Sequence, residues 1–133
     1  MARQTGFTKA SRELIVARAS GMCEVMRQGC QFTGSEIHHR MTRGMGAPRV
    51  DGINSPANGL LLCSSCHRWV TENPLVSYRL GWAIRRNGIQ APTVVEVLWR
   101  KTSWVLLDDD GRMEIVRPNT SQHITDVFEV DAS

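Results

Sequence analysis

Hydrophobic positions at helical spacing first occur between Thr8 and Ser20, where Leu14, Ile15 and Ala19 lie near one face with charged residues between them. Apolar residues three to four positions apart share one side of a helix, so this segment is predicted to be a short amphipathic helix. Thr8 is a suitable N-cap, and Gly21 is typical of a residue that ends a helix.

The centre of the chain combines short apolar pieces with one long loop. Residues 35–40 are predicted to be extended, and three successive leucines at 60–62 predict one buried strand. Between them, residues 41–57 are rich in glycine, proline and asparagine. Such a density of turn-forming residues predicts a loop that joins the two extended pieces.

Two short helices are predicted to follow the leucines. Ser64 or Ser65 can cap a helix that runs to about Glu72. Pro74 ends it, because proline lacks the backbone N–H that a helix interior needs. Asn73-Pro74 can in turn start another short helix, since proline is well suited to the first helical turn.

The remainder of the chain changes to a β pattern. Residues 94–100 and 104–107 are rich in β-formers, and a turn at 108–111 leads into the apolar residues 113–116. This pattern predicts a C-terminal β-hairpin packed on the core. Residues 118–133 form an acidic tail that we expect to be peripheral.

Composition narrows the class of protein. At 133 residues the chain is one domain in length, and no apolar run is long enough to span a membrane. No secretory apolar region follows the N-terminus, so we expect a cytoplasmic, reducing setting. In that setting the four cysteines are expected to bind metal before they form disulfides.

Charge is distributed unevenly. Residues 1–107 carry a formal net charge of +8 and residues 108–133 carry −5, and 14 of the 16 basic residues are arginine. The planar guanidinium fork matches phosphate oxygens, so a basic body suits a polyanion such as nucleic acid. A solvated surface enriched in arginine explains the charge equally well.

The cysteines are spaced for a metal site. Cys63-Ser-Ser-Cys66 has the two-residue gap of a zinc knuckle, whereas Cys23 and Cys30 are separated by six residues. Four thiolates would hold a structural zinc ion and leave no open position for a substrate. Buried free thiols and a redox pair are the alternatives.

Histidines occur beside this pattern. His38 and His39 are adjacent, so on a strand their side chains point to opposite faces and one can bind a metal while the other faces a substrate. His67 directly follows Cys66 at the start of a predicted helix. Asn58 lies where the loop enters the leucine strand, and its amide can clamp backbone across a hairpin.

In this order, the cysteines, Glu36-Ile-His38-His39, Asn58 and Cys66-His67 resemble the HNH endonucleases with a four-cysteine zinc site. The chain is most similar to small HNH proteins of phages that infect actinobacteria. The motif covers residues 23–73, and a looser likeness through Gly81-Trp82 and the segment from Trp104 to Gly111 extends to about 116.

The resemblance implies a ββα-metal core in a small α+β fold, with the zinc knuckle, the N-terminal helix and the C-terminal β-hairpin added to it. One nuclease domain would span residues 1–117, followed by the acidic tail at 118–133. His39 would be the general base, His38 and His67 would hold a catalytic divalent ion, and Asn58 would hold the two strands and orient His39. The structural zinc would be held by Cys23, Cys30, Cys63 and Cys66. Related toxin nucleases carry a further histidine at the position of Thr71, which leaves this chain with two protein ligands to the ion.

The expected activity is metal-dependent cleavage of DNA with weak sequence preference. Two histidine ligands tolerate Mg²⁺, Mn²⁺, Ni²⁺ or Zn²⁺ as the catalytic ion. Arginines that flank the motif are candidates for phosphate contacts, with the first two favoured: Arg40, Arg43, Arg49 and Arg68. The resemblance also implies a phage terminase as a partner in DNA packaging.

Other functions stay open at this point. A zinc-stapled module that binds DNA or protein without cutting would not need the full set of His38, His39, Asn58 and His67. A specific homing or restriction nuclease would need a recognition domain, for which the chain has little room. An RNA nuclease is separated from a DNA nuclease only by substrate competition. The oligomeric state does not follow from the sequence.

Overall fold

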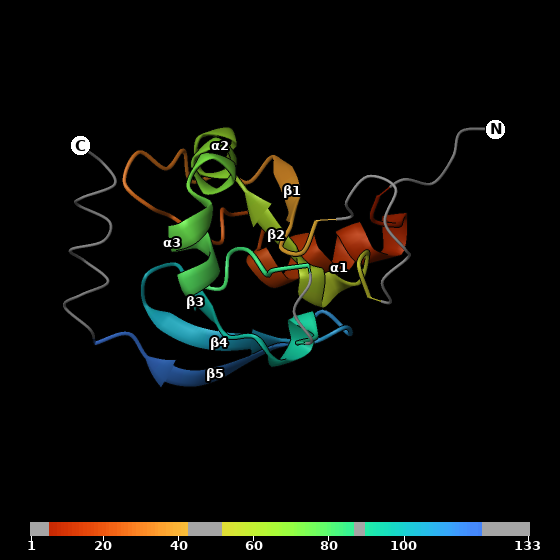
Figure 1. The fold of residues 1–133 in the computed structure, drawn as a ribbon. Helices are drawn as coiled ribbons and strands as arrows, with labels where there is room; N and C mark the ends of the chain where they lie inside the picture. The colour runs from red at the N-terminus through yellow and green to blue at the C-terminus, as the bar shows by residue number, and fades with distance from the viewer. Residues whose placement is uncertain (1–5, 43–51, 87–89, 121–133) are drawn as a thin grey trace.

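The computed structural model describes residues 6–42, 52–86 and 90–120. Helices and strands are mixed along the described ranges (Figure 1). The strands form two antiparallel sheets, one with the order β1-β2 and one with the order β3-β4-β5. This is the small α+β architecture predicted from the sequence pattern.

Helix α1 spans Lys9–Ala19 and forms where the pattern predicts it. The Thr8 hydroxyl caps it by accepting a hydrogen bond from the backbone N–H of Ser11 at 3.1 Å. Ile15 is fully buried against the hairpin. The helix ends at Ser20, which adopts a left-handed conformation one residue before the predicted glycine stop.

The central hairpin consists of β1 (Glu36–His39) and β2 (Gly59–Leu62). The register pairs His38 with Leu60 and His39 with Gly59, and all four residues of β2 are buried. A short 3-10 helix, η1 (Pro56–Asn58), leads into β2. The hairpin therefore places the histidine doublet at the end of β1, next to the start of β2.

Two helices follow the hairpin: α2 (Ser64–Glu72) and α3 (Pro74–Arg79). Their boundaries agree with the sequence, but the predicted serine cap of α2 is wrong. Cys63 is the N-cap, and its Sγ atom accepts a hydrogen bond from the backbone N–H of Cys66 at 3.3 Å. A knuckle cysteine therefore takes the place of the serine hydroxyl.

The predicted C-terminal hairpin forms two strands of a three-stranded sheet. Strands β4 (Ser103–Leu107) and β5 (Met113–Pro118) form that hairpin, and β3 (Val97–Trp99) adds a third strand beside β4. A further 3-10 helix, η2 (Pro92–Val94), occupies the beginning of the segment predicted to be extended. Proline at its first position favours the helical turn.

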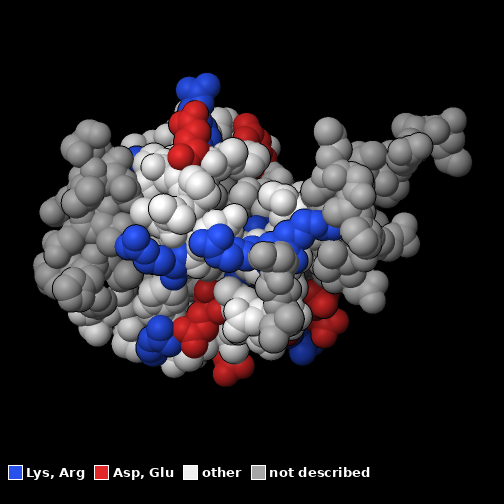
Figure 2. Space-filling view, viewed as in Figure 1, with Lys and Arg blue, Asp and Glu red and all other residues white. Residues whose placement is uncertain are grey.

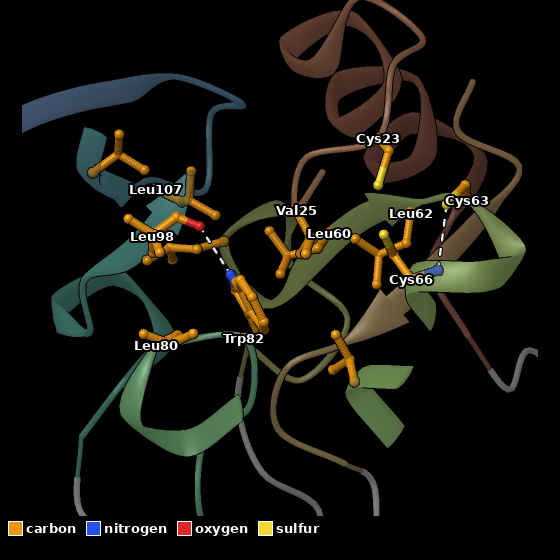
Figure 3. Packing of buried hydrophobic residues seen from close by; sticks show 14 residues of the cluster. Cys23, Val25, Leu60, Leu62, Cys63, Cys66, Leu80, Trp82, Leu98 and Leu107 are labelled. Atoms are coloured by element: carbon orange, nitrogen blue, oxygen red, sulfur yellow. Dashed lines mark hydrogen bonds between the residues drawn. The ribbon is translucent and has the colours of Figure 1, made fainter. Parts of the chain in front are cut away.

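One apolar core joins the hairpin to the three-stranded sheet (Figure 3). Trp82 is fully buried at its centre and donates a hydrogen bond from its indole N–H to the Leu98 carbonyl at 2.8 Å. A buried ion pair ties α1 into the same interior, because the guanidinium of Arg18 meets the carboxylate of Glu24 at 2.7 Å. None of the described helices is long and apolar enough to cross a membrane.

Candidate functional site

The four cysteines meet at one point. Their Sγ atoms all lie within 4.8 Å of one another, and those of Cys30 and Cys63 are 3.8 Å apart. Figure 3 shows the sulfur atoms of Cys23, Cys63 and Cys66 gathered beside the start of α2. Four sulfur ligands at this spacing fit a tetrahedral zinc ion. The structure therefore supports the predicted four-cysteine metal site.

The long gap between the first two cysteines is closed by a folded loop. Met26 and Gly29 both have positive φ angles, of 52° and 88°, which turn the backbone sharply between Cys23 and Cys30. The backbone N–H of Cys30 donates to the Arg27 carbonyl at 3.0 Å. The six intervening residues thus form a compact turn, and the unusual spacing does not open the site.

Backbone and thiol groups polarise the cysteine cluster. Hydrogen bonding from the Cys66 thiol lowers the pKa of Cys23 to about 5. Burial raises the pKa of Cys30 to about 11, and the hydrogen bond to Cys23 raises the pKa of Cys66. The lowered pKa of Cys23 favours its thiolate, and a divalent ion would favour the thiolate form of the other cysteines.

His38 lies in strand β1 and is buried, with 8% of its surface exposed. Its Nε2 atom lies 2.8 Å from the Trp82 carbonyl oxygen, which can only accept, so Nε2 carries the proton and the lone pair is on Nδ1. Burial lowers the pKa of His38 to about 4, which keeps the ring neutral at neutral pH. A neutral imidazole is the form that binds metal.

His67 meets His38 from the first turn of α2. The two ring centroids are 5.2 Å apart with an interplanar angle of 67°. The Nδ1 atom of His67 lies 2.6 Å from Oε1 of Glu36, whose pKa is lowered by this hydrogen bond. Metal-ligating histidines commonly give one ring N–H to a carboxylate or carbonyl acceptor, and both rings have such a partner.

His39 points to the opposite side of β1, as the alternation of a strand predicts. Its ring stacks on Phe7, with centroids 4.1 Å apart and planes inclined by 20°. Its Nε2 atom lies 2.8 Å from Oδ1 of Asn54. His38, His39 and His67 nevertheless line one common cavity of about 500 Å³.

Asn58 is buried and clamps the two ends of the loop. Its Oδ1 atom accepts from the backbone N–H of Met41 at 2.8 Å, and its Nδ2 atom donates to the carbonyls of Met41 and Ile53 at 3.0 and 2.7 Å. This is the clamp predicted from its position before the leucine strand. Asn58 holds the backbone beyond His39, whereas Asn54 contacts the ring.

The predicted role of Arg40 in gripping phosphate is wrong. Arg40 is 1% exposed, and its guanidinium donates to the backbone carbonyls of Ala57, Gly81, Pro92 and Val95 at 2.7 to 3.0 Å. Alternation along the chain after β1 turns this side chain inward. Arg40 lines the histidine cavity, but its guanidinium is bonded to the loop and to the segments before the sheet.

The other three arginines predicted to contact phosphate differ in where they lie. Arg68 is exposed on α2 beside His67 and can face a ligand. Arg43 and Arg49 lie outside the described residues, as does His123. Thr71, at the position of the further histidine in toxin nucleases, lines the cavity and donates its hydroxyl hydrogen to the His67 carbonyl at 2.9 Å.

A basic region not predicted from the sequence borders the cavity. Arg86 lines it and donates to the Thr42 carbonyl at 2.9 Å. Arg85 stacks over the ring of Tyr78, another lining residue, with 4.2 Å from its guanidinium carbon to the ring centroid. Figure 2 shows a band of Lys and Arg side chains across this face at the level of α3 and the segment after it.

Glu36 and Asn54, whose side chains hydrogen-bond the histidines, were not predicted as partners from the sequence. Glu36 has a sequence signal, because it precedes His38 by two residues and therefore shares its face of β1. Asn54 has none, because its approach to His39 depends on the path of the loop.

Comparison with known proteins agrees with the geometry. Residues 30–70 match the family model of the HNH endonucleases. The matched segment contains the histidine doublet, Asn58, His67 and three of the four cysteines, and the match indicates nuclease chemistry. Neither the curated proteins nor the solved structures gave a match.

Proposed function

We propose that the chain is a metal-dependent DNA endonuclease that hydrolyses phosphodiester bonds with weak sequence preference. The observation that carries the proposal is the meeting of three histidines from two elements at one cavity. His38 and His39 come from β1 and His67 from α2, and the matched HNH segment contains all three.

The residues present fit a divalent ion. His38 Nδ1 and His67 Nε2 carry the lone pairs once their other ring nitrogens donate to Trp82 and Glu36. A bound ion would supply charge stabilisation at the scissile phosphate and its leaving oxygen. Two imidazoles with open positions admit Mg²⁺, Mn²⁺, Ni²⁺ or Zn²⁺.

His39 is the proposed general base. It takes a proton from a water molecule whose oxygen attacks phosphorus, the bond from phosphorus to the leaving oxygen breaks, and that oxygen is protonated from solvent. Positioned general bases contribute rate factors of about 10² to 10⁴, so loss of the ring is expected to abolish measurable cutting.

DNA is the proposed substrate, held through its phosphates. Arg86 lines the cavity, Arg85 stacks over its lining residue Tyr78, and Arg68 lines a second pocket that also contains His67. Contacts of this kind add affinity without reading bases, which agrees with weak sequence preference. Competition between DNA and RNA duplexes distinguishes the two polyanions.

The test is plasmid cleavage by the purified protein with Mg²⁺, Mn²⁺, Ni²⁺, Zn²⁺ or EDTA, beside His39→Ala. We expect metal-dependent conversion of supercoiled plasmid by the wild type and none by the variant. Equal zinc content and equal thermal unfolding show that the variant is folded. A wild type that binds plasmid but does not nick it with any of these ions contradicts the proposal.

A binding module without cleavage activity is the second candidate, favoured by the closed cysteine cluster and the basic band. It predicts plasmid binding that His39→Ala leaves unchanged and no cutting by either protein. Phage origin, a terminase partner and a cytoplasmic location remain predictions of the sequence. If a terminase is needed, addition of its subunits restores cutting.

A further inference from the structure

Two side chains from outside the histidine motif hold the ring of His39. Phe7, which precedes α1, stacks on one face with 4.1 Å between ring centroids. Asn54, in the loop before η1, contacts the ring edge with 2.8 Å between its Oδ1 and Nε2 of His39. Phe7 is itself nearly buried, so its ring forms a fixed surface against the imidazole.

The contact with Asn54 selects one tautomer of the imidazole. An amide oxygen only accepts hydrogen bonds, so Nε2 of His39 must carry the proton. The lone pair of the neutral ring is then on Nδ1. A general base needs its lone pair on a known atom and in a known direction, and a stacked ring whose Nε2 atom is hydrogen-bonded fixes both.

We infer that Asn54 is the positioning residue of His39: its side-chain oxygen fixes the tautomer and rotation of the ring while Phe7 fixes its plane. This inference deepens the proposed function and rests on it, since His39 is the base of that reaction. It assigns to Asn54 the orienting role that the resemblance implies for Asn58.

Asn58 and Asn54 have different roles because their side-chain amides bind different partners. The side chain of Asn58 bonds the backbone of Met41 and Ile53 and fixes the loop ends. Asn54 directly follows Ile53, one of these two residues, and lies four residues before Asn58. The Asn58 clamp therefore sets where Asn54 stands, and Asn54 acts on the ring.

The experiment compares three variants of the full-length, zinc-loaded protein. Asn54→Leu keeps the size of the side chain and removes the acceptor, and Asn54→Asp keeps an oxygen acceptor at the same position. Asn119→Ala is the control, because it also removes a side-chain hydrogen bond, to the Lys101 carbonyl, at an exposed site far along the chain.

The Asn54→Leu substitution is expected to lower the turnover rate and to leave the affinity for DNA unchanged. Loss of a group that orients a catalytic side chain costs about 10- to 100-fold, so Asn54→Leu should lower kcat by that factor. Its Kd for a short DNA duplex in EDTA should remain that of the wild type. Asn54→Asp should recover most of kcat, and Asn119→Ala should match the wild type. Equal losses in kcat and DNA affinity, or wild-type turnover in Asn54→Leu, would overturn the inference.

A spectroscopic measurement tests the hydrogen bond without any activity. Protein labelled with ¹⁵N-histidine should show His39 with its proton on Nε2, and that proton should exchange slowly with water. Asn54→Leu should lose the slow exchange, and Asn54→Asp should keep it. A proton on Nδ1 in the wild type would contradict the inference. If the wild type cuts no DNA, the proposed function fails while this result still decides the contact.

Discussion

Arg40 shows how a residue's surroundings decide its role. It directly follows two histidines of the site, yet its guanidinium donates to four backbone carbonyls from the loop before β2 and the segments around η2 and α3. Burial lowers the pKa of Arg40 to about 9, so the group stays charged at neutral pH. The charge is satisfied by carbonyl dipoles and holds the interior together.

Replacement of Arg40 should therefore affect stability. We expect Arg40→Met to lower the free energy of unfolding by about 3 kcal/mol or more, because it leaves buried carbonyls unpaired. Arg68→Met, at an exposed position, should change stability by less than about 0.5 kcal/mol and weaken DNA binding instead. Urea unfolding measures the free energy of unfolding, and titration with a DNA duplex measures the affinity for DNA. A stable Arg40→Met with weakened DNA binding would instead support a phosphate contact by Arg40.

Glu36 has a role that its neighbours explain. It shares the face of β1 with His38 and bonds His67 and the Ser64 hydroxyl, at 2.6 and 3.0 Å. Glu36→Gln should weaken binding of Mn²⁺ at the histidine pair by about 10-fold or more, because the carboxylate orients the His67 ring. Calorimetric titration of the zinc-loaded protein measures this. Unchanged Mn²⁺ affinity at unchanged zinc content would argue against the role.

At the scale of elements, the turn after α3 decides how the sheet meets the hairpin. Gly81 has a φ angle of 76°, and a Cβ atom there would overlap with the Glu96 carbonyl oxygen. The next residue, Trp82, fills the centre of the core, and its carbonyl bonds His38. The close approach of this turn to Glu96, the residue before β3, thus also positions a ligand of the proposed catalytic ion.

Gly21 and Gly81 have similar positive φ angles. A comparison of their alanine variants therefore separates the cost of the left-handed conformation from the cost of steric overlap. Gly21 has a φ angle of 74° with nothing within 4 Å of an added Cβ. Gly21→Ala should cost about 1 to 2 kcal/mol for the left-handed conformation. Gly81→Ala should cost about 2 kcal/mol more, because backbone must also move. Equal losses in thermal or urea unfolding would show that the turn is free to shift.

At the scale of the molecule, the described residues are held by a main apolar core, a smaller apolar cluster between α1 and β2, and the cysteine cluster. The cysteine cluster joins the loop after α1 to the start of α2, at one end of the core that continues through Trp82 to the three-stranded sheet (Figure 3). Loop closure over a long sequence separation is expensive in entropy, so a metal ion at this point stabilises the whole fold.

Removal of zinc should therefore unfold more than the knuckle. We expect one zinc ion per chain, measured by atomic absorption, and a large drop in Tm after chelation or in Cys63→Ser. Ser65→Ala, between the two cysteines, is the matched control and should keep both zinc and Tm. If Cys63→Ser unfolds at the wild-type temperature, the cluster does not hold the fold.

Arg85 and Arg86, in the basic region beside the cavity, should each contribute to the salt dependence of DNA binding. Every phosphate that a protein neutralises adds about 0.9 to the slope of log Kobs against log salt for duplex DNA. Arg85→Ala/Arg86→Ala in the His39→Ala background should thus reduce the slope by about 1.8. The control, Lys101→Ala/Arg112→Ala, removes the same charge from loops of the three-stranded sheet and should keep the slope. Equal slopes would exclude the pair from the interface.

The sequence by itself determined the local elements and the metal chemistry. Helix caps, prolines and strand alternation act over a few residues, so α1, the hairpin, α2 and α3 follow from the pattern. The Cys-x-x-Cys pair, the histidine doublet and Asn58 likewise carry their chemistry in their spacing. The placement of the two histidines on opposite faces of β1 follows from the alternation of a strand alone.

Tertiary structure decided which polar groups serve the interior and which face the cavity. Arg40 turned inward, Asn54 reached His39 and Arg86 joined the cavity because segments far apart in sequence pack together, and no local pattern encodes those distances. Contacts between distant segments depend on the whole packed core, and for that reason the chemistry was visible in the sequence while its positioning was not.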